Sequence, residues 1–255
     1  MKRSIAAAAA CSLAGAAWGT TITYGPNSVG TYAGGAAPVL ATDAAQIGSG
    51  SWRAGGVGKT WIDIDISSLG AFTVGDIESI SWHTKQGTGS PDLFWYLSMY
   101  TYDANDAQDA GWYTHRLTAE PIYANNKNVD ASGWTEWTTD AGPNQLTFHD
   151  GNRTNQGFYG APTLADIQAG SLDWADFANS GSGDVINYAD DLVMLLRIET
   201  GSGWAAGFDG YLDGITVTLK SGLTITIDLE AVPAPHAAGL GLLGLSALAA
   251  RRRRA

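Results

Sequence analysis

Short runs of β-branched and aromatic residues recur between residues 22 and 229, and glycine, asparagine, aspartate and serine separate them. Residues 61–66 (WIDIDI) alternate apolar and polar positions, which is typical of a strand with one buried face. Residues 77–82, 210–219 and 224–229 are also rich in β-branched residues. Short strands divided by turn-forming residues predict an all-β domain.

Two longer apolar runs fit the interior of such a domain. Residues 93–102 (LFWYLSMYTY) are too continuously apolar for a solvated face, so we expect a central strand of a sandwich. Residues 192–198 (LVMLLRI) could form a helix by composition, but their length and the glycine that follows favour a strand.

One short helix is predicted at residues 163–170, because Thr163 can cap its start and Gly170 can end it. Residues 172–178 are a second candidate helix. Roughly eight or more strands in this length suit a two-sheet jelly-roll-like sandwich with one or two short helices. We assign that single β-sandwich domain to residues 20–230.

The N-terminus has the pattern of a secretory signal peptide. Lys2 and Arg3 precede an uncharged apolar run, and small residues then stand at cleavage spacing before residue 20. Residues 1–19 are therefore expected to pass the Sec translocon and be removed by signal peptidase. The single cysteine, Cys11, would leave with them, which excludes an internal disulfide framework.

The C-terminus, residues 231–255, has three parts in order. An extended proline motif is followed by an uncharged run at 237–250, which is short for a membrane helix. A block of arginines ends the chain and would hold that end in the cytoplasm. The motif is Val232, Pro233, Ala234 and Pro235, and the block is Arg251, Arg252, Arg253 and Arg254.

These three parts resemble the PEP-CTERM sorting signal of Gram-negative bacteria, although Pro233-Ala234-Pro235 stands where that family usually has Pro-Glu-Pro. The resemblance implies an exosortase as partner and transient anchoring in the inner membrane by the C-terminal transmembrane helix. The protein would then be released to the cell surface or the extracellular polysaccharide matrix.

Charge narrows the ligand classes. The net charge of the whole chain is −11, which disfavours nucleic acid, because phosphate binding depends on lysine and arginine. Removal of both terminal signals takes six basic residues and leaves 8 against all 25 acidic ones. A passenger of such acidity attracts divalent cations and is a poor direct binder of acidic polysaccharide, unless a metal bridges the two.

Oxygen-rich segments suggest structural calcium, because Ca²⁺ takes six to eight oxygen ligands. One candidate follows the aromatic run, and the second is a pair on the closing strand. Both also fit ordinary surface turns, since aspartate and asparagine favour turns. The candidate ligands are Asp103, Asn105, Asp106 and Asp109 in the first place, and Asp209 and Asp213 in the second.

Aromatic and charged residues gather between positions 112 and 137. Aromatic rings can stack on the apolar face of a sugar while charged groups bind its hydroxyls, although each of these rings could equally be core. The candidate ligand-binding residues are Trp112, Arg116, Glu120, Trp134 and Trp137. The closing segment 208–219 (FDGYLDGITVTL) is similar to the last strands of carbohydrate-binding jelly-roll modules, which implies a glycan ligand.

No catalytic motif stands out. The chain has no nucleophile elbow, and the spacing of Glu120, Glu136 and Glu199 does not pair two carboxylates for glycoside hydrolysis. We therefore expect a non-catalytic, exported glycan-binding protein, with structural calcium as a further expectation from the oxygen-rich segments. The alternative is a secreted glycan-active enzyme, a hydrolase or lyase, whose carboxylates meet only in the fold.

Overall fold

The computed structural model describes residues 19–23, 29–31, 37–55, 58–88, 90, 92–106, 111–152, 159–177, 183–201, 204 and 207–229. The sorting signal and all but the last residue of the signal peptide lie outside these ranges. In the part of the chain that is described, no helix has the length and apolar character needed to cross a membrane.

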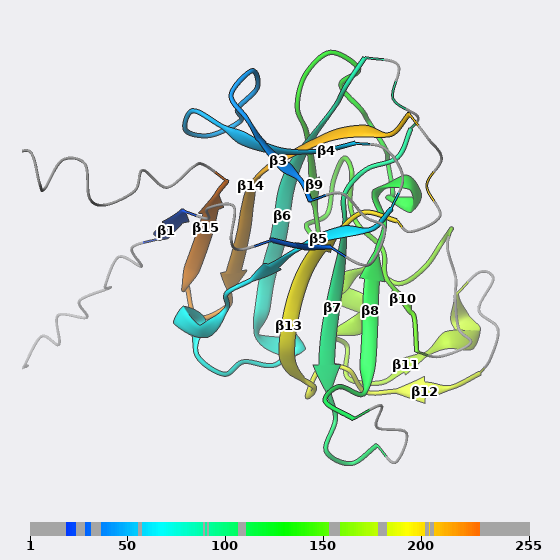
Figure 1. The fold of residues 1–255 in the computed structure, drawn as a ribbon. Helices are drawn as coiled ribbons and strands as arrows, with labels where there is room; N and C mark the ends of the chain where they lie inside the picture. The colour runs from blue at the N-terminus through cyan, green and yellow to red at the C-terminus, as the bar shows by residue number, and fades with distance from the viewer. Residues whose placement is uncertain are drawn as a thin grey trace, which may run out of the picture.

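A seven-stranded sheet forms one layer of the molecule (Figure 1). Its long strand β14 pairs with β6 on one side, while β4 and then β15 share the other side. Gly214 takes a φ of 58° at the irregularity in β14, a conformation that glycine adopts readily. The strands are β1 (Thr20–Thr23), β3 (Val39–Ala41), β4 (Ser51–Gly55), β6 (Ile77–Gln86), β9 (Thr135–Thr138), β14 (Asp209–Leu219) and β15 (Thr224–Asp228).

A six-stranded antiparallel sheet forms the other layer, in the order β10-β8-β7-β13-β5-β2. The chain crosses repeatedly between the layers, as from β4 to β5, β6 and β7 (Figure 1). The strands are β2 (Val29–Thr31), β5 (Thr60–Ile64), β7 (Tyr96–Tyr102), β8 (His115–Ala119), β10 (His149–Asp150) and β13 (Leu192–Glu199); β11 (Leu172–Asp173) and β12 (Val185–Ile186) form a small separate pair. The predicted all-β, jelly-roll-like sandwich is confirmed.

Alternate residues of both sheets fill the space between the layers. Ile62 and Ile64 of β5, and Leu97 and Met99 of β7, are buried in the core, as the alternation predicts. The prediction of a central strand is confirmed, because β7 lies between β8 and β13. Five tryptophans that are fully buried, namely Trp52, Trp82, Trp95, Trp137 and Trp174, give the core much of its volume.

The first predicted helix is present as α1 (Leu164–Ile167). Its cap is reciprocal: the Thr163 N–H donates to the Asp166 carboxylate at 2.8 Å, and the Asp166 N–H donates to the Thr163 hydroxyl at 3.3 Å. The second candidate forms β11 and the 3-10 helix η5 (Trp174–Asp176) rather than an α-helix. The other 3-10 turns of the described residues are η2 (Ser67–Leu69), η3 (Val74–Asp76) and η4 (Pro121–Tyr123).

Candidate functional site

The side chains of the six-stranded sheet that point away from the core form a face rich in charged and aromatic residues, here called the six-stranded outer face. Charged and aromatic residues occupy it in rows that run across the strands, where directly paired residues are close neighbours. From β5 towards β10 the rows are Trp61–Glu199–Tyr96, then Asp63–Arg197–Ser98–Thr118–His149, then Leu195–Tyr100–Arg116.

Glu199 lies at the centre of this face, with only 2% of its side chain exposed. Its carboxylate accepts a hydrogen bond from the Ser98 hydroxyl at 2.7 Å and pairs with the Lys59 ammonium at 2.7 Å. Burial, and next the charge of Glu199, raise the pKa of Tyr96 far above its usual value. Tyr96 is therefore a neutral phenol that packs beside a fixed ion pair.

Arg197 is the second fixed charge of the face. Its guanidinium donates to both carboxylate oxygens of Asp63, at 2.6 and 3.0 Å. It also lies 4.8 Å from the ring centroid of Trp61 and 5.7 Å from that of Tyr100. Bidentate pairing and stacking hold the group rigid, while 43% of the Asp63 side chain is exposed.

Glu120 and His149 extend the polar region towards the edge of the sheet. Burial, and next the charge of Glu199, raise the pKa of Glu120, against the opposing charge of Lys59. Burial, and next the charge of Arg116, lower the pKa of His149 to about 4. His149 is therefore neutral at pH 7, and its Nε2 lies 4.0 Å from a Glu120 carboxylate oxygen.

Aromatic rings surround these polar groups. Trp112, with 49% of its surface exposed, stacks on Tyr100 at a centroid distance of 5.1 Å, and Tyr113 meets both rings edge-on. Tyr159 meets Tyr123 edge-on at 4.9 Å, and burial, and next the charge of Glu120, raise the pKa of Tyr123. The aromatic residues at this face are Trp61, Tyr96, Tyr100, Trp112, Tyr113, Tyr123, Tyr159 and Trp204.

The fold divides the predicted binding residues among three places. Trp112, Arg116 and Glu120 lie at the six-stranded outer face. Trp134 lies on the outer side of the seven-stranded sheet, where its ring meets that of Tyr211 edge-on at a centroid distance of 6.4 Å. Trp137 is fully buried, and its indole N–H donates to Thr84 at 2.7 Å, so the prediction that it contacts a ligand is wrong.

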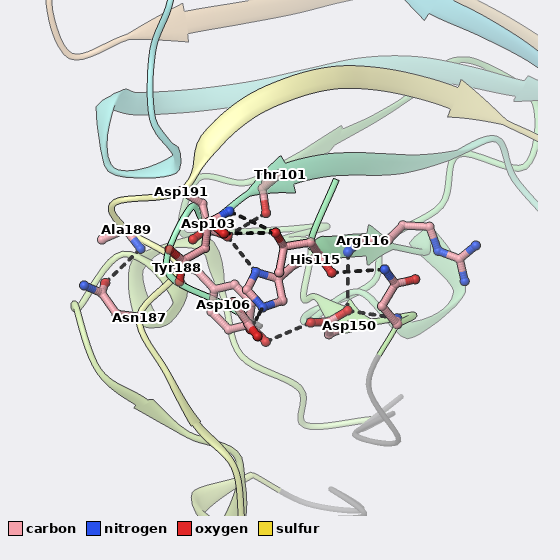
Figure 2. Close-up of polar contacts among 12 residues, drawn as sticks. Thr101, Asp103, Asp106, His115, Arg116, Asp150, Asn187, Tyr188, Ala189 and Asp191 are labelled. Carbon is pink, nitrogen blue, oxygen red and sulfur yellow. Dashed lines mark hydrogen bonds and ion pairs between the residues drawn. The ribbon is translucent and has the colours of Figure 1, made fainter. Parts of the chain in front are cut away.

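The predicted calcium ligands of the first segment hold a turn together. The Asp103 carboxylate accepts the N–H of Asn105 at 2.8 Å, while Asp106 lies 3.3 Å from Nε2 of His115. The ring of His115 is fully buried, and its Nδ1 lies 2.7 Å from the Asp191 carboxylate. Figure 2 shows Asp106 and Asp191 on either side of this ring, with the Arg116 guanidinium pointing away from it. An open pocket of about 330 Å³ adjoins the turn.

The two predicted calcium ligands of the closing strand, Asp209 and Asp213, have different partners. Asp213 is fully buried and accepts the backbone N–H groups of Gln46, Ile47 and Gly214 at 2.8 to 3.0 Å. Asp209 pairs with Arg53 instead. Asp109 lies outside the described residues, among which no group of three or more histidine, cysteine or acidic side chains is arranged to hold a metal ion.

Most residues of the six-stranded outer face were not predicted from the sequence, although the alternation of charged positions in two strands indicates them. Arg197 and Glu199 stand at alternate positions of an otherwise apolar strand, so both side chains point to the same face. Trp61 and Asp63 alternate in the same way in β5. Only the strand register reveals that these two pairs lie side by side.

Comparisons with known proteins found a match by structure and none by sequence. No protein-family description and no curated protein matches the chain. A match among solved structures is the CBM22-1 xylan-binding domain from Paenibacillus barcinonensis Xyn10C. It is 12% identical, with 80% of this chain and 89% of that chain covered at a TM-score of 0.39.

Proposed function

We propose that the protein is a non-catalytic glycan-binding protein and that its ligand lies on the six-stranded outer face. The observation that carries the proposal is the combination there of rigid ion pairs with aromatic rings. A sugar ring presents an apolar face that can stack on tryptophan or tyrosine, and hydroxyls that can both donate and accept hydrogen bonds. The exposed Asp63 carboxylate, held by Arg197, offers an acceptor in a fixed position, and the buried Glu199 holds the Lys59 ammonium in place as a donor.

A neutral glycan fits this face better than a charged one. The cations Arg197 and Lys59 already have carboxylate partners at 2.6 to 3.0 Å, so an anionic ligand would have to compete with them. The strong negative charge of the passenger would also repel an acidic polysaccharide.

Binding can be tested with purified protein on an array of neutral and acidic glycans, followed by titration of the best neutral oligosaccharide. We expect Trp61→Ala to weaken binding at least tenfold. It removes a ring on which the sugar can stack, and the same ring supports the Arg197 guanidinium. Leu223→Ala, at an exposed position in the turn between β14 and β15, is the matched control and should bind normally. Equal affinities of Trp61→Ala and the wild type would contradict the proposed site.

The location proposed for this activity is the cell surface or extracellular matrix. Its support is the sequence alone, from the signal peptide and the resemblance of residues 231–255 to a PEP-CTERM signal. In a host with an exosortase, we expect the surface-extracted protein to lack residues 237–255. Its intact mass tests this, and retention of Arg251 to Arg254 would contradict processing.

A second candidate is a glycan-active enzyme, and the Glu120–Glu199 pair favours it. Glycoside hydrolysis uses one carboxyl with a raised pKa, and burial together with the charge of Glu199 raises the pKa of Glu120. Release of reducing ends from the bound glycan would indicate this activity, and Glu120→Gln should abolish the release without loss of binding. Binding with no release supports the first proposal.

A further inference from the structure

The opposite side of the sandwich carries a second row of the same chemistry, here called the seven-stranded outer face. Arg53 of β4 pairs in register with Tyr211 of β14, and Tyr211 pairs with Lys85 of β6. Thr84 pairs with Thr135, so Trp134 stands next to Lys85 at the end of β9. The row therefore alternates cation, aromatic ring, cation and aromatic ring across four strands.

Arg53 repeats the arrangement of Arg197. Its Nε and Nη2 each donate to one carboxylate oxygen of Asp209 at 2.6 Å, and its guanidinium carbon lies 4.9 Å from the Tyr211 ring centroid. The Tyr211 hydroxyl donates to Asp43 at 3.0 Å, which fixes the ring. Hydrogen bonds and stacking thus hold both charges in place, and 40% of the Arg53 side chain is exposed.

Two open pockets adjoin this row and share the segment 85–88. One, of about 400 Å³, includes Arg53 and Asp209, and the other, of about 530 Å³, extends to Ser132. Asp209 lies so close to Gly87 that a Cβ atom there would collide with its carboxylate. The shared glycine thus leaves space for the carboxylate between the two pockets.

The lining of both pockets suits a ligand rich in hydroxyl groups. Arg53 and Lys85 are donors, Asp43 and Asp209 are acceptors, and the remaining polar side chains can do both. The two cations and two anions leave no net charge to attract an ion. Two adjoining pockets that are polar and without net charge, beside an aromatic pair, match a linear neutral glycan.

We propose that the seven-stranded outer face is a second glycan-binding site, so that each molecule can bridge two glycan chains. The choice of ligand rests on the proposed function, whereas the site itself does not. The two outer faces point in opposite directions from the sandwich, so one chain lying flat on either face cannot reach the other. The consequence is crosslinking of a polysaccharide rather than tighter binding to one strand.

The test separates the two sites by variants. Purified protein is titrated with the neutral hexasaccharide that binds best on the array, and the turbidity of the parent polysaccharide is recorded. The wild type should bind two hexasaccharides and raise the turbidity. Trp134→Ala and Asp209→Asn should each leave one hexasaccharide per protein and abolish the rise, while Leu223→Ala should behave as the wild type.

If the wild type does not bind two hexasaccharides, the Trp61→Ala variant shows which of the two proposals has failed. With the first site weakened, this variant should still bind one hexasaccharide, and Trp61→Ala combined with Trp134→Ala should bind none. Binding of one hexasaccharide by the wild type that Trp61→Ala removes would overturn the second site and leave the proposed function intact. Absence of binding by every protein to every neutral glycan would overturn both, provided that circular dichroism shows each variant folded.

Discussion

The two outer faces of the sandwich hold the same stacked arginine–aspartate pair in different surroundings. On the six-stranded sheet Arg197 is 13% exposed and lies among buried groups such as Glu199. On the seven-stranded sheet Arg53 is 40% exposed and lines an open pocket. The two arginines are therefore screened differently, because water reaches Arg53 more readily than Arg197.

Burial on the six-stranded face makes its polar groups interdependent. Glu199 affects the pKa of both Tyr96 and Glu120, and Arg116 affects that of His149. On the seven-stranded face, by contrast, Asp43 is mostly exposed and lies 4.0 Å from Arg53. We therefore expect changes on the first face to alter stability and binding together, and changes on the second to alter binding alone.

The largest expected effect distinguishes the seven-stranded outer face from the core beneath it. Trp137→Ala should cost roughly 3–5 kcal/mol of unfolding free energy, because the ring is fully buried. Trp134→Ala, only partly buried at the outer face, should cost less than about 1 kcal/mol. Urea denaturation of both variants measures this, and loss of the fold in both would show that Trp134 is a core residue as well.

The alternation of side chains along a strand explains why Trp137 is buried and Trp134 is not, and this alternation can be predicted from the sequence. Positions 134 and 137 are an odd number of residues apart, so around β9 their side chains point to opposite sides. The alternation of β5, the apolar length of β7 and the cap of α1 were likewise readable, because each depends on neighbouring residues. The rows of the outer faces were not, because Trp61, Glu199 and Tyr96 meet only through strand register.

The next largest effect is on the free energy of unfolding when one carboxylate of an ion pair is neutralised on each face. Glu199→Gln should destabilise the protein by about 3 kcal/mol, because Lys59, with 17% of its side chain exposed, loses its buried partner. Asp43→Asn should cost less than about 1 kcal/mol, because its carboxylate is well exposed. Chemical denaturation at pH 7 measures both values, and equal costs would remove the distinction between the faces.

Acid should destabilise the six-stranded face through His149. The pKa of this group is about 4 in the folded protein and 6.5 when unfolded, so the unfolded chain binds the proton first as pH falls. The stability is therefore present above pH 6.5 and is lost as pH falls towards 4, by roughly 3 kcal/mol at about 1.4 kcal/mol per pKa unit.

His149→Gln cannot take up this proton, so between pH 7 and pH 4 it should lose less stability than the wild type. Glu120 acts in the opposite direction: its pKa is raised in the folded protein, so its contribution is lost as pH rises. Melting curves of wild type and variant at several pH values isolate the histidine, because Glu120 is present in both. Parallel pH profiles would show that His149 is accessible to protons in the folded state.

Salt should have the smallest effect, and it should be small on both faces. Stacking of a sugar on Trp61 or beside Trp134 needs no net charge, and the arginines of both faces are already paired with carboxylates. Screening by salt acts mainly on exposed, separated charges, so affinity for a neutral glycan should change less than about twofold between 0.05 and 0.5 M sodium chloride. Titrations of Trp61→Ala and Trp134→Ala at the two concentrations examine each face alone. In Trp61→Ala the seven-stranded face is the site that remains, and its Arg53 is more exposed than Arg197. A loss of affinity with salt in this variant alone would mean that the seven-stranded face binds its ligand through charge. Its ligand would then be an anionic rather than a neutral glycan.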